Sequence, residues 1–495
     1  MYYVSTRDNS LNLSPAEAIA QGLSREGGLF VPVVLPRLPG HALETLRDMN
    51  YQQRAVYVMD LYLKHFTTFE LTRATVAAYG PSKFDTKEVA PVRKVDENTY
   101  CLELWHGPTC AFKDMALQML PHLLSLSLKK NNEKKTACIL VATSGDTGKA
   151  ALEGFKDVDQ TKILVFYPKD GVSEIQQLQM ATQEGDNVDV CAVEGNFDDA
   201  QTGVKVLFSD PALRAQLAER GYFLSSANSI NWGRVLPQIV YYISAYCDLL
   251  KQEVIQVGDP INVCVPTGNF GNILAAYFAK EMGVPIQRLI CASNSNNVLT
   301  DFINTGVYDR NRKFYNTVSP SMDILISSNL ERLIYLLSGR DDKLVQTYMQ
   351  QLSDTGHYEV TPAILKKIQA CFSAGYADEA STKATIAEMK RKHDYLIDTH
   401  TAVAFKVLED YRKESGDDTI TVVASTASPF KFCDAVLDAL SVKTKKTGTD
   451  LLDQLAQVSG VEAPAPLATL KDKEVRFTKW TDKDKMKSVV TDFLR

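Results

Sequence analysis

The chain has 495 residues, of which 45% are apolar and 23% are charged, and its formal net charge at neutral pH is −6. This composition excludes a disordered or fibrous chain, and the length predicts two or three domains that each bury their own core. The negative charge argues against nucleic acid or an anionic membrane as a partner. Scattered cysteines, no Cys-x-x-Cys pair, no signal-peptide pattern and no long apolar run predict a soluble cytoplasmic protein without a metal site.

The first 92 residues are expected to form a mainly helical N-terminal domain. In Ser14-Pro-Ala-Glu17, a capping hydroxyl precedes a first-turn proline and a glutamate follows three residues later. This arrangement predicts that an amphipathic helix begins here. Gly27 and Gly28 then interrupt the helical pattern.

From about residue 95 onward, short β-rich runs alternate with helical stretches, which predicts an α/β protein with a largely parallel sheet. The expected strands are continuous apolar runs, as buried parallel strands are, and they span residues 137–142, 162–167, 188–193, 262–265, 288–292 and 419–424. Residues 319–401 are expected to be mainly helical. The charged segment 471–487 is expected to be a solvated surface.

One predicted strand runs into a glycine-rich turn, Gly268-Asn-Phe-Gly-Asn272, which opens directly into a helix. Glycines let the backbone approach a ligand, and the free N–H groups of a helix start attract anions. Each such contribution is only about 1 kcal/mol, so several amides must converge on one phosphate. A turn that binds nothing is the alternative. A dinucleotide site is disfavoured because the turn does not fit G-x-G-x-x-G.

A second turn, Thr143-Ser-Gly-Asp-Thr-Gly148, also follows a strand and starts a helix. It is not a P-loop, because Thr143 stands where glycine is required and Ala150 stands where Mg²⁺ needs a hydroxyl. Its hydroxyls and amides suit a carboxylate or a second phosphate. Lys149 is interpreted as a solvated helix residue.

A third strand end reads Ser425-Thr-Ala-Ser-Pro-Phe-Lys-Phe432. Ser428 suits the cap of a helix that begins at Pro429, whereas Thr426 is expected to face the strand ends, where open α/β sheets bind ligands.

Lys113 begins an apolar helix directly after a Gly-Pro turn. It is either a surface lysine whose aliphatic stem lies on apolar neighbours, or an amine desolvated beside Phe112 and Met115. Desolvation lowers the pKa of an amine and makes it reactive toward a carbonyl. A reactive lysine together with a separate phosphate site indicates pyridoxal phosphate.

At this point the chain resembles the threonine synthase family, pyridoxal-phosphate enzymes of fold type II related to tryptophan synthase β. The resemblance rests on motifs in this order: Tyr3-Val-Ser-Thr-Arg7, Glu26-Gly-Gly-Leu-Phe-Val-Pro32, His106-Gly-Pro-Thr-Cys-Ala-Phe-Lys-Asp114, Thr143-Ser-Gly-Asp-Thr-Gly148, Asn228-Ser-Ile-Asn-Trp-Gly-Arg234, Gly268-Asn-Phe-Gly-Asn272, Ser319-Pro-Ser-Met-Asp-Ile324 and His400-Thr-Ala402. The sequence departs from the family pattern at Ser428, where the family has histidine, and at Thr399, where the family often has proline.

The resemblance implies two doubly wound, mostly parallel sheet domains besides the N-terminal domain (1–92): a large cofactor domain (93–124 and 231–495) and a small substrate domain (125–230). It implies that Lys113 binds pyridoxal 5′-phosphate as a Schiff base and that Thr426 bonds the pyridine nitrogen. His106 and His400 are interpreted as packing or capping residues. The implied phosphate loop is Gly268, Asn269, Phe270, Gly271 and Asn272, and the implied substrate contacts are Thr143, Ser144, Asp146, Thr147, Asn231 and Arg234.

The implied reaction converts O-phospho-L-homoserine and water to L-threonine and phosphate, the last step of threonine biosynthesis. Lys113 is expected to move protons at the substrate's Cα and Cβ, while phosphate leaves from Cγ and water adds at Cβ. The alternatives are a threonine-synthase-like phospholyase that releases a 2-oxo acid and a non-catalytic protein that keeps the fold. The protein is expected to be a monomer or a homodimer.

Overall fold

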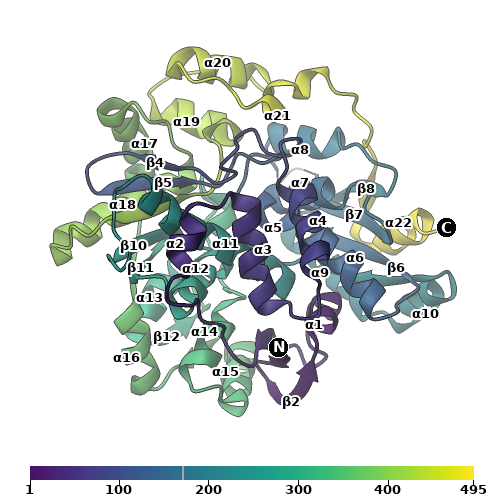
Figure 1. Ribbon diagram of the computed structural model, residues 1–495. Helices are drawn as coiled ribbons and strands as arrows, with labels where there is room; N and C mark the ends of the chain where they lie inside the picture. The colour runs from purple at the N-terminus through teal and green to yellow at the C-terminus, as the bar shows by residue number, and fades with distance from the viewer. Residues whose placement is uncertain (170–171) are drawn as a thin grey trace.

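The computed structural model describes residues 1–169 and 172–495, and its two largest β-sheets are twisted and flanked by helices (Figure 1). Helices of the N-terminal region contact helices of both sheet units. The sheets and their flanking helices confirm the α/β fold expected from the sequence. No helix in the described ranges has the length and hydropathy needed to span a bilayer.

The large sheet has six strands in the order β14-β11-β10-β15-β5-β4, and all are parallel except β4, which pairs antiparallel with β5. The three predicted strands in this sheet are confirmed, whereas β4, β5 and β14 were not predicted. The bounds are β4 (Val92–Lys94), β5 (Thr99–Glu103), β10 (Ile261–Pro266), β11 (Ile286–Ser293), β14 (Phe372–Tyr376) and β15 (Thr421–Ser425).

Alternate residues of the large-sheet strands belong to different cores, so both faces are covered. Val263 and Val265 of β10 lie in the core that contains α11, α12 and α13, whereas Cys264 lies in the core that contains α17, α18 and α19. These helices are α11 (Trp232–Lys251), α12 (Gly271–Glu281), α13 (Val298–Thr305), α17 (Glu379–His393), α18 (Thr399–Ser415) and α19 (Cys433–Ala439). Between residues 319 and 401 the expected helices are present, namely α14 (Leu330–Leu337), α15 (Asp342–Thr355), α16 (Pro362–Cys371) and α17.

The small sheet is wholly parallel, in the order β16-β8-β7-β6-β9, and it also carries helices on both faces. Its three predicted strands are confirmed. The strands are β6 (Thr136–Ala142), β7 (Thr161–Pro168), β8 (Val188–Glu194), β9 (Tyr222–Ser225) and β16 (Trp480–Asp482), and the helices are α5 (Asp114–Leu117), α6 (Leu120–Lys130), α7 (Asp146–Phe155), α8 (Glu174–Ala181), α9 (Phe197–Ser209) and α10 (Pro211–Glu219).

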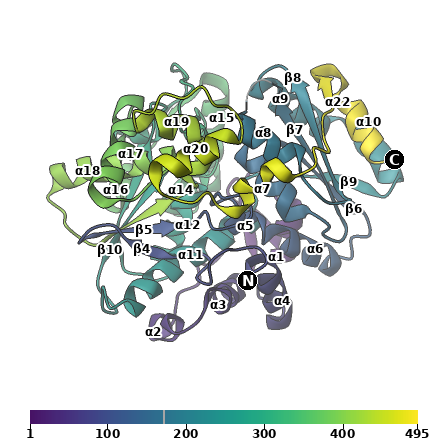
Figure 2. The same ribbon diagram turned by 90° about the horizontal axis from the view of Figure 1, so that it is seen from above.

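The C-terminal segment differs from the prediction. Strand β16 pairs with β8, and helix α22 (Met486–Phe493) places Met486 and Val490 in the core of the small sheet. Figures 1 and 2 show the chain passing from α20 (Asp450–Ser459) above the large sheet across to α22 beside the small one. The assignment of all of residues 231–495 to the large domain therefore does not hold for this segment, because it joins the small sheet. Most of residues 471–487 are exposed, as expected, but Thr481 and Met486 are buried.

The N-terminal region is less helical than expected. Strands β1 (Tyr3–Ser5), β2 (Asp8–Leu13) and β3 (Phe30–Pro32) form an antiparallel sheet. The predicted helix is present as α1 (Pro15–Gln21), with the capping box of Ser14 and Glu17, and the further helices are α2 (Ala42–Arg47), α3 (Tyr51–Tyr62) and α4 (Thr68–Tyr79). Two of the three strands have only three residues, which is too short for a periodic signal.

Candidate active site

Lys113 lies at the N-terminal end of α5, beside the carboxyl end of β15. Its segment is joined to the β15 end by main-chain contacts: Phe112 N donates to the Thr426 carbonyl at 2.7 Å, and Ser428 N donates to the Cys110 carbonyl at 3.0 Å. A β-bridge between Ala111 and Ala427 lies between these two bonds. The backbone therefore holds Lys113 and Thr426 close together, as the sequence interpretation requires.

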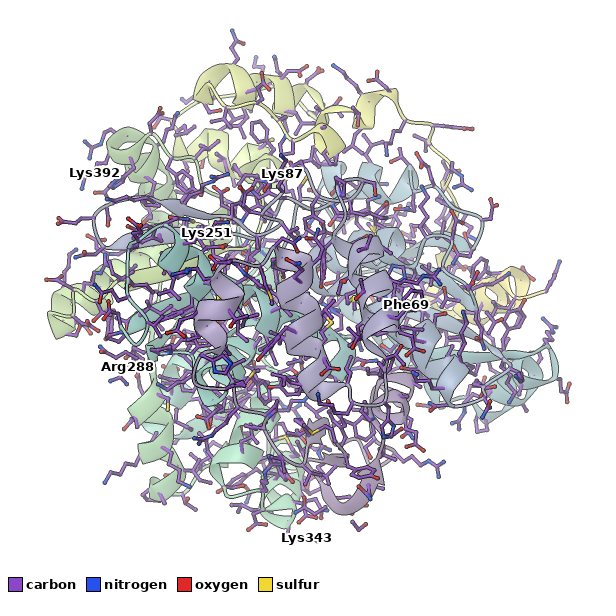
Figure 3. All side chains as sticks on the ribbon, viewed as in Figure 1. Phe69, Lys87, Lys251, Arg288, Lys343 and Lys392 are labelled. Atoms are coloured by element: carbon purple, nitrogen blue, oxygen red, sulfur yellow. The ribbon has the colours of Figure 1, made fainter. Side chains whose placement is uncertain are left out.

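The Lys113 amine is half-buried, and its Nζ donates to the Ser321 hydroxyl oxygen at 3.2 Å. Burial lowers the pKa of Lys113 to about 8; Asp146 opposes this shift, whereas Arg234 and Lys431 add to it. Exposed lysines such as Lys343 and Lys392 extend from the surface instead (Figure 3). At neutral pH about a tenth of the Lys113 population is then the free amine, which is the nucleophilic form.

The glycine-rich turn connects β10 to α12 and is shaped for close approach. A side chain at Gly268 would place its Cβ 2.6 Å from the Ser321 carbonyl oxygen, so only glycine fits there. Phe270 adopts a left-handed conformation with φ of 64°, although it is not glycine, and its ring packs 5.8 Å from that of Phe372. A left-handed residue followed by helical ones directs successive N–H groups into one concavity, which suits an anion.

Two buried nitrogen donors at this site have no hydrogen-bond partner among residues 1–169 and 172–495. They are Asn272 Nδ2, on the first turn of α12, and Arg234 Nε, on the first turn of α11. The other end of the Asn272 amide is occupied, because its Oδ1 accepts from the hydroxyls of Tyr241 and Tyr242. Buried donors without acceptors are costly. These two nitrogens therefore fit a bound anion such as a phosphate.

Arg234 is buried, and no carboxylate of the described ranges forms an ion pair with it. Its Nη1 donates to the Ala227 carbonyl at 2.6 Å, and burial lowers its pKa to about 10. Because a buried guanidinium normally has an anionic partner, this residue supports an anionic ligand. Asn231 is placed differently, since its Oδ1 caps α11 at Gly233 N and its Nδ2 donates to the Ile19 carbonyl.

The second turn places four predicted residues at the start of α7 in two different ways. The Thr143 hydroxyl oxygen accepts from Gly145 N and Gly148 N at 3.0 and 2.9 Å, so it stabilises the turn itself. Ser144 and Thr147 are half-buried, and their hydroxyls take part in none of the hydrogen bonds between described residues. These two hydroxyls are therefore available to a ligand, together with the amides of the helix start.

Asp146 forms a buried ion pair with Lys431, a residue to which the sequence analysis assigned no role. Lys431 Nζ lies 2.9 Å from Asp146 Oδ1 and also donates to the Thr109 carbonyl at 2.8 Å and to Gln179 Oε1 at 3.2 Å. Although burial alone would raise the pKa of Asp146, Lys431 and then Lys113 hold it well below its usual range. The position of Lys431 between Phe430 and Phe432 was the available sequence signal.

Lys149 is not solvated, contrary to expectation. It is 6% exposed and its Nζ contacts Gln183 Oε1 at 2.5 Å and Glu153 at 3.4 Å. Thr426 is buried, and its hydroxyl makes no hydrogen bond to any other described residue. Ser428 caps the helical turn at Phe430 N, as predicted.

Both histidines contact carboxylates and have structural roles. His106 lies between Asp85, at 2.6 Å, and Glu103, at 2.9 Å, and these bonds outweigh burial and raise its pKa to about 8. His400 Nδ1 lies 2.8 Å from Asp398 Oδ2 at the start of α18.

Three family models match this chain: "Threonine synthase N terminus" over residues 2–79, "Pyridoxal-phosphate dependent enzyme" over 87–426 and "Threonine synthase, C-terminal" over 401–490. The human protein named threonine synthase-like 1 is 42% identical over 86% of this chain. Threonine synthase of Eremothecium gossypii is 36% identical over 99% of this chain and 98% of its own. The chain spans only 58% of the length of the human relative.

The crystal structure of PLP-bound threonine synthase from Brucella melitensis has the same fold, with a TM-score of 0.89, 36% identity and full coverage of both chains. Because whole-length relatives and the family models agree, the chain belongs to the threonine synthase family of pyridoxal-phosphate-dependent enzymes, with the type II fold.

Proposed function

We propose that this protein binds pyridoxal 5′-phosphate and acts as a threonine synthase, which converts O-phospho-L-homoserine and water to L-threonine and phosphate. One observation carries the proposal. The amine of Lys113, with its lowered pKa, shares a site with two buried nitrogen donors, of Asn272 and Arg234, that lack acceptors. A site with a reactive amine and unpaired donors for phosphate is what this cofactor and this substrate need.

We assign the cofactor's phosphate to the turn from Gly268 to Asn272, whose amides and glycines form the concavity. The hydroxyl of Thr426 is free to bond the pyridine nitrogen, and as a neutral group it would not hold that nitrogen protonated. When bound, the cofactor supplies an electron sink that stabilises negative charge on the substrate's carbon atoms.

The protein's own residues bind the substrate and move its protons. Ser144 and Thr147, at the start of α7, hold the substrate's carboxylate, while Thr143 and Asp146 keep this turn in shape. Arg234 binds the phosphate of the substrate through charged hydrogen bonds, and Asn231 contributes indirectly by capping the helix that carries Arg234. Lys113 Nζ takes up and returns the protons at Cα and Cβ, because its pKa near 8 permits both steps at neutral pH.

The relatives carry two different names, so a second reaction competes with threonine synthesis as the function of this site. The proteins named threonine synthase-like 1 are 40–42% identical to this chain, somewhat more than the named threonine synthases at 35–37%. A phospholyase built on the same site would release phosphate, a 2-oxo acid and ammonia, because no water would add at Cβ. We place the protein in the cytoplasm, as a monomer or homodimer, and its nine free cysteines support a reducing compartment.

The test is a product assay with O-phospho-L-homoserine, with and without added cofactor. We expect threonine as the main product, and 2-oxobutyrate as the main product would contradict synthase activity. Borohydride reduction and peptide mapping should place the cofactor on Lys113. Lys113→Ala should lose both the label and turnover, whereas Lys87→Ala, a change at an exposed lysine, should keep them.

A further inference from the structure

Ser321 links the reactive amine to a buried acid–histidine pair. Its hydroxyl oxygen accepts from Lys113 Nζ at 3.2 Å, and its backbone N–H donates to His400 Nε2 at 3.2 Å. His400 Nδ1 in turn lies 2.8 Å from Asp398, which is fully buried. Since Nε2 is an acceptor in this arrangement, Nδ1 carries the hydrogen and His400 is neutral. The chain of contacts thus runs from Asp398 through His400 and Ser321 to Lys113.

The position of Ser321 is fixed by contacts with two neighbouring segments. Asp398 is held by the N–H groups of His400 and Thr401, at 2.9 and 3.2 Å, which orients the imidazole. On the other side, the carbonyl oxygen of Ser321 would be only 2.6 Å from a Cβ placed on Gly268, so the Ser321 backbone lies directly against the glycine-rich turn. Ser321 therefore lies between the helix start that carries His400 and the glycine-rich turn.

Ser321 also has hydrogen-bonding capacity to spare. Among the residues that the structure describes, its hydroxyl makes one hydrogen bond, as the acceptor from Lys113, and Lys113 Nζ has no second acceptor. The charged groups that act on Lys113 are Asp146, Arg234 and Lys431, and Asp146 is already paired with Lys431. The hydroxyl of Ser321 is thus the group that receives the ammonium form of Lys113.

We propose that Ser321 is a further catalytic residue, which binds the amine of Lys113 whenever that amine is detached from the cofactor, and that His400 and Asp398 are its positioning residues. The proposal rests on the proposed function, since it assumes that Lys113 is released and recaptured in each cycle. Ser321 donates no proton to Lys113 in this role, so the amine alone gains and loses the hydrogen.

The test measures the reactivity of Lys113 without cofactor or substrate. The full-length protein, freed of cofactor, is treated with formaldehyde and cyanoborohydride between pH 6 and 10, and methylation of Lys113 is followed by peptide mapping. Loss of a hydrogen-bond acceptor destabilises the ammonium form, so Ser321→Ala should move the midpoint of labelling down by about one pH unit. At pH 7 the labelling rate should then rise about five-fold.

Matched variants separate this role from a general loosening of the loop. Ser321→Thr keeps a hydroxyl and should restore the wild-type midpoint. Ser328→Ala removes a nearby hydroxyl that contacts Asn269 instead of Lys113 and should leave the midpoint unchanged. His400→Leu should shift the midpoint in the same direction as Ser321→Ala, while His400→Gln, which retains an acceptor, should shift it less.

Each outcome decides between the two proposals. If Ser321→Ala and Ser321→Thr both label as the wild type does, Ser321 is not the partner of Lys113 and the inference is wrong. An equal shift in Ser328→Ala would also overturn it, because loop loosening would then explain the result. If the wild-type protein binds no cofactor at Lys113, the proposed function fails, whatever the labelling profile of Ser321→Ala.

Discussion

Replacing Lys431 by methionine tests the buried ion pair that joins the two sheet units. The Lys431 side chain is fully buried and that of Asp146 is 4% exposed. Lys431→Met keeps the length of the side chain but leaves Asp146 charged, with the bond from Gln176 Nε2 at 3.0 Å as its remaining close contact. Breaking a buried pair on one side typically costs about 3–5 kcal/mol, and the Thr109 carbonyl also loses its partner.

Urea unfolding at pH 7, followed by far-UV circular dichroism, measures this loss of free energy. The matched control is Lys383→Met, because Lys383 pairs with Asp438 at 2.8 Å while the two side chains are 35% and 67% exposed. An exposed pair is worth about 0–1 kcal/mol. We expect Lys431→Met to be destabilised by at least about 2 kcal/mol more than Lys383→Met.

A double-mutant cycle isolates the pair itself. In Lys431→Met/Asp146→Asn no charge is left buried, so this variant should be more stable than the sum of the two single changes predicts, by about 1 kcal/mol or more. Equal unfolding free energies for Lys431→Met and Lys383→Met, or strict additivity in the cycle, would refute the reasoning that an uncompensated charge is the main cost.

Three further predictions follow from the same structure. Gly268→Ala should destabilise the protein by about 1–3 kcal/mol through its clash and weaken binding of pyridoxal phosphate in a fluorescence titration, whereas Gly40→Ala, in open space, should change neither; normal affinity in Gly268→Ala would contradict the proposed phosphate site. Arg234→Leu should lower kcat/KM for O-phospho-L-homoserine by about 10- to 100-fold with an unchanged circular dichroism spectrum, and a value within about two-fold of wild type would remove Arg234 from the substrate site. The raised pKa of His106 contributes stability that is complete below about pH 6.5 and lost as pH rises through about 8. Urea midpoints should therefore fall more steeply between pH 6 and 9 in the wild type than in His106→Asn, and parallel curves would contradict this.

Local sequence patterns predicted much of the fold because its central strands are buried on both faces. The strands at residues 137–142 and 262–265 are recognisable as continuous apolar runs, and the glycine turn after the second is where we propose that phosphate binds. Short strands carry no comparable signal. Strand β16 has three residues in a charged segment, and its pairing with β8 depends on a partner far away in the chain.

The contacts around the candidate site could not be predicted from the sequence, because their partners are also far apart in the chain. Ser321 and Lys113 are 208 residues apart in the sequence and are brought together by the tertiary fold. Lys149 resembles an ordinary surface lysine in sequence. Although Phe430 and Phe432 flank Lys431, nothing local shows that Gln183 or Asp146 will lie opposite the two amines. The sequence therefore predicts which chemical groups the candidate site contains, but it does not predict which side chains contact them.

The main-chain bridge between residues 110–112 and 426–428 sets how far apart two segments of the candidate site lie. Its bonds use backbone atoms only, so no side-chain atom at position 428 is needed to form them. Serine at position 428 is buried, and its hydroxyl caps the turn that follows at Phe430 N. The distance between Lys113 and Thr426 is thus set by the backbone, whereas the side chain at position 428 acts on the turn beyond it.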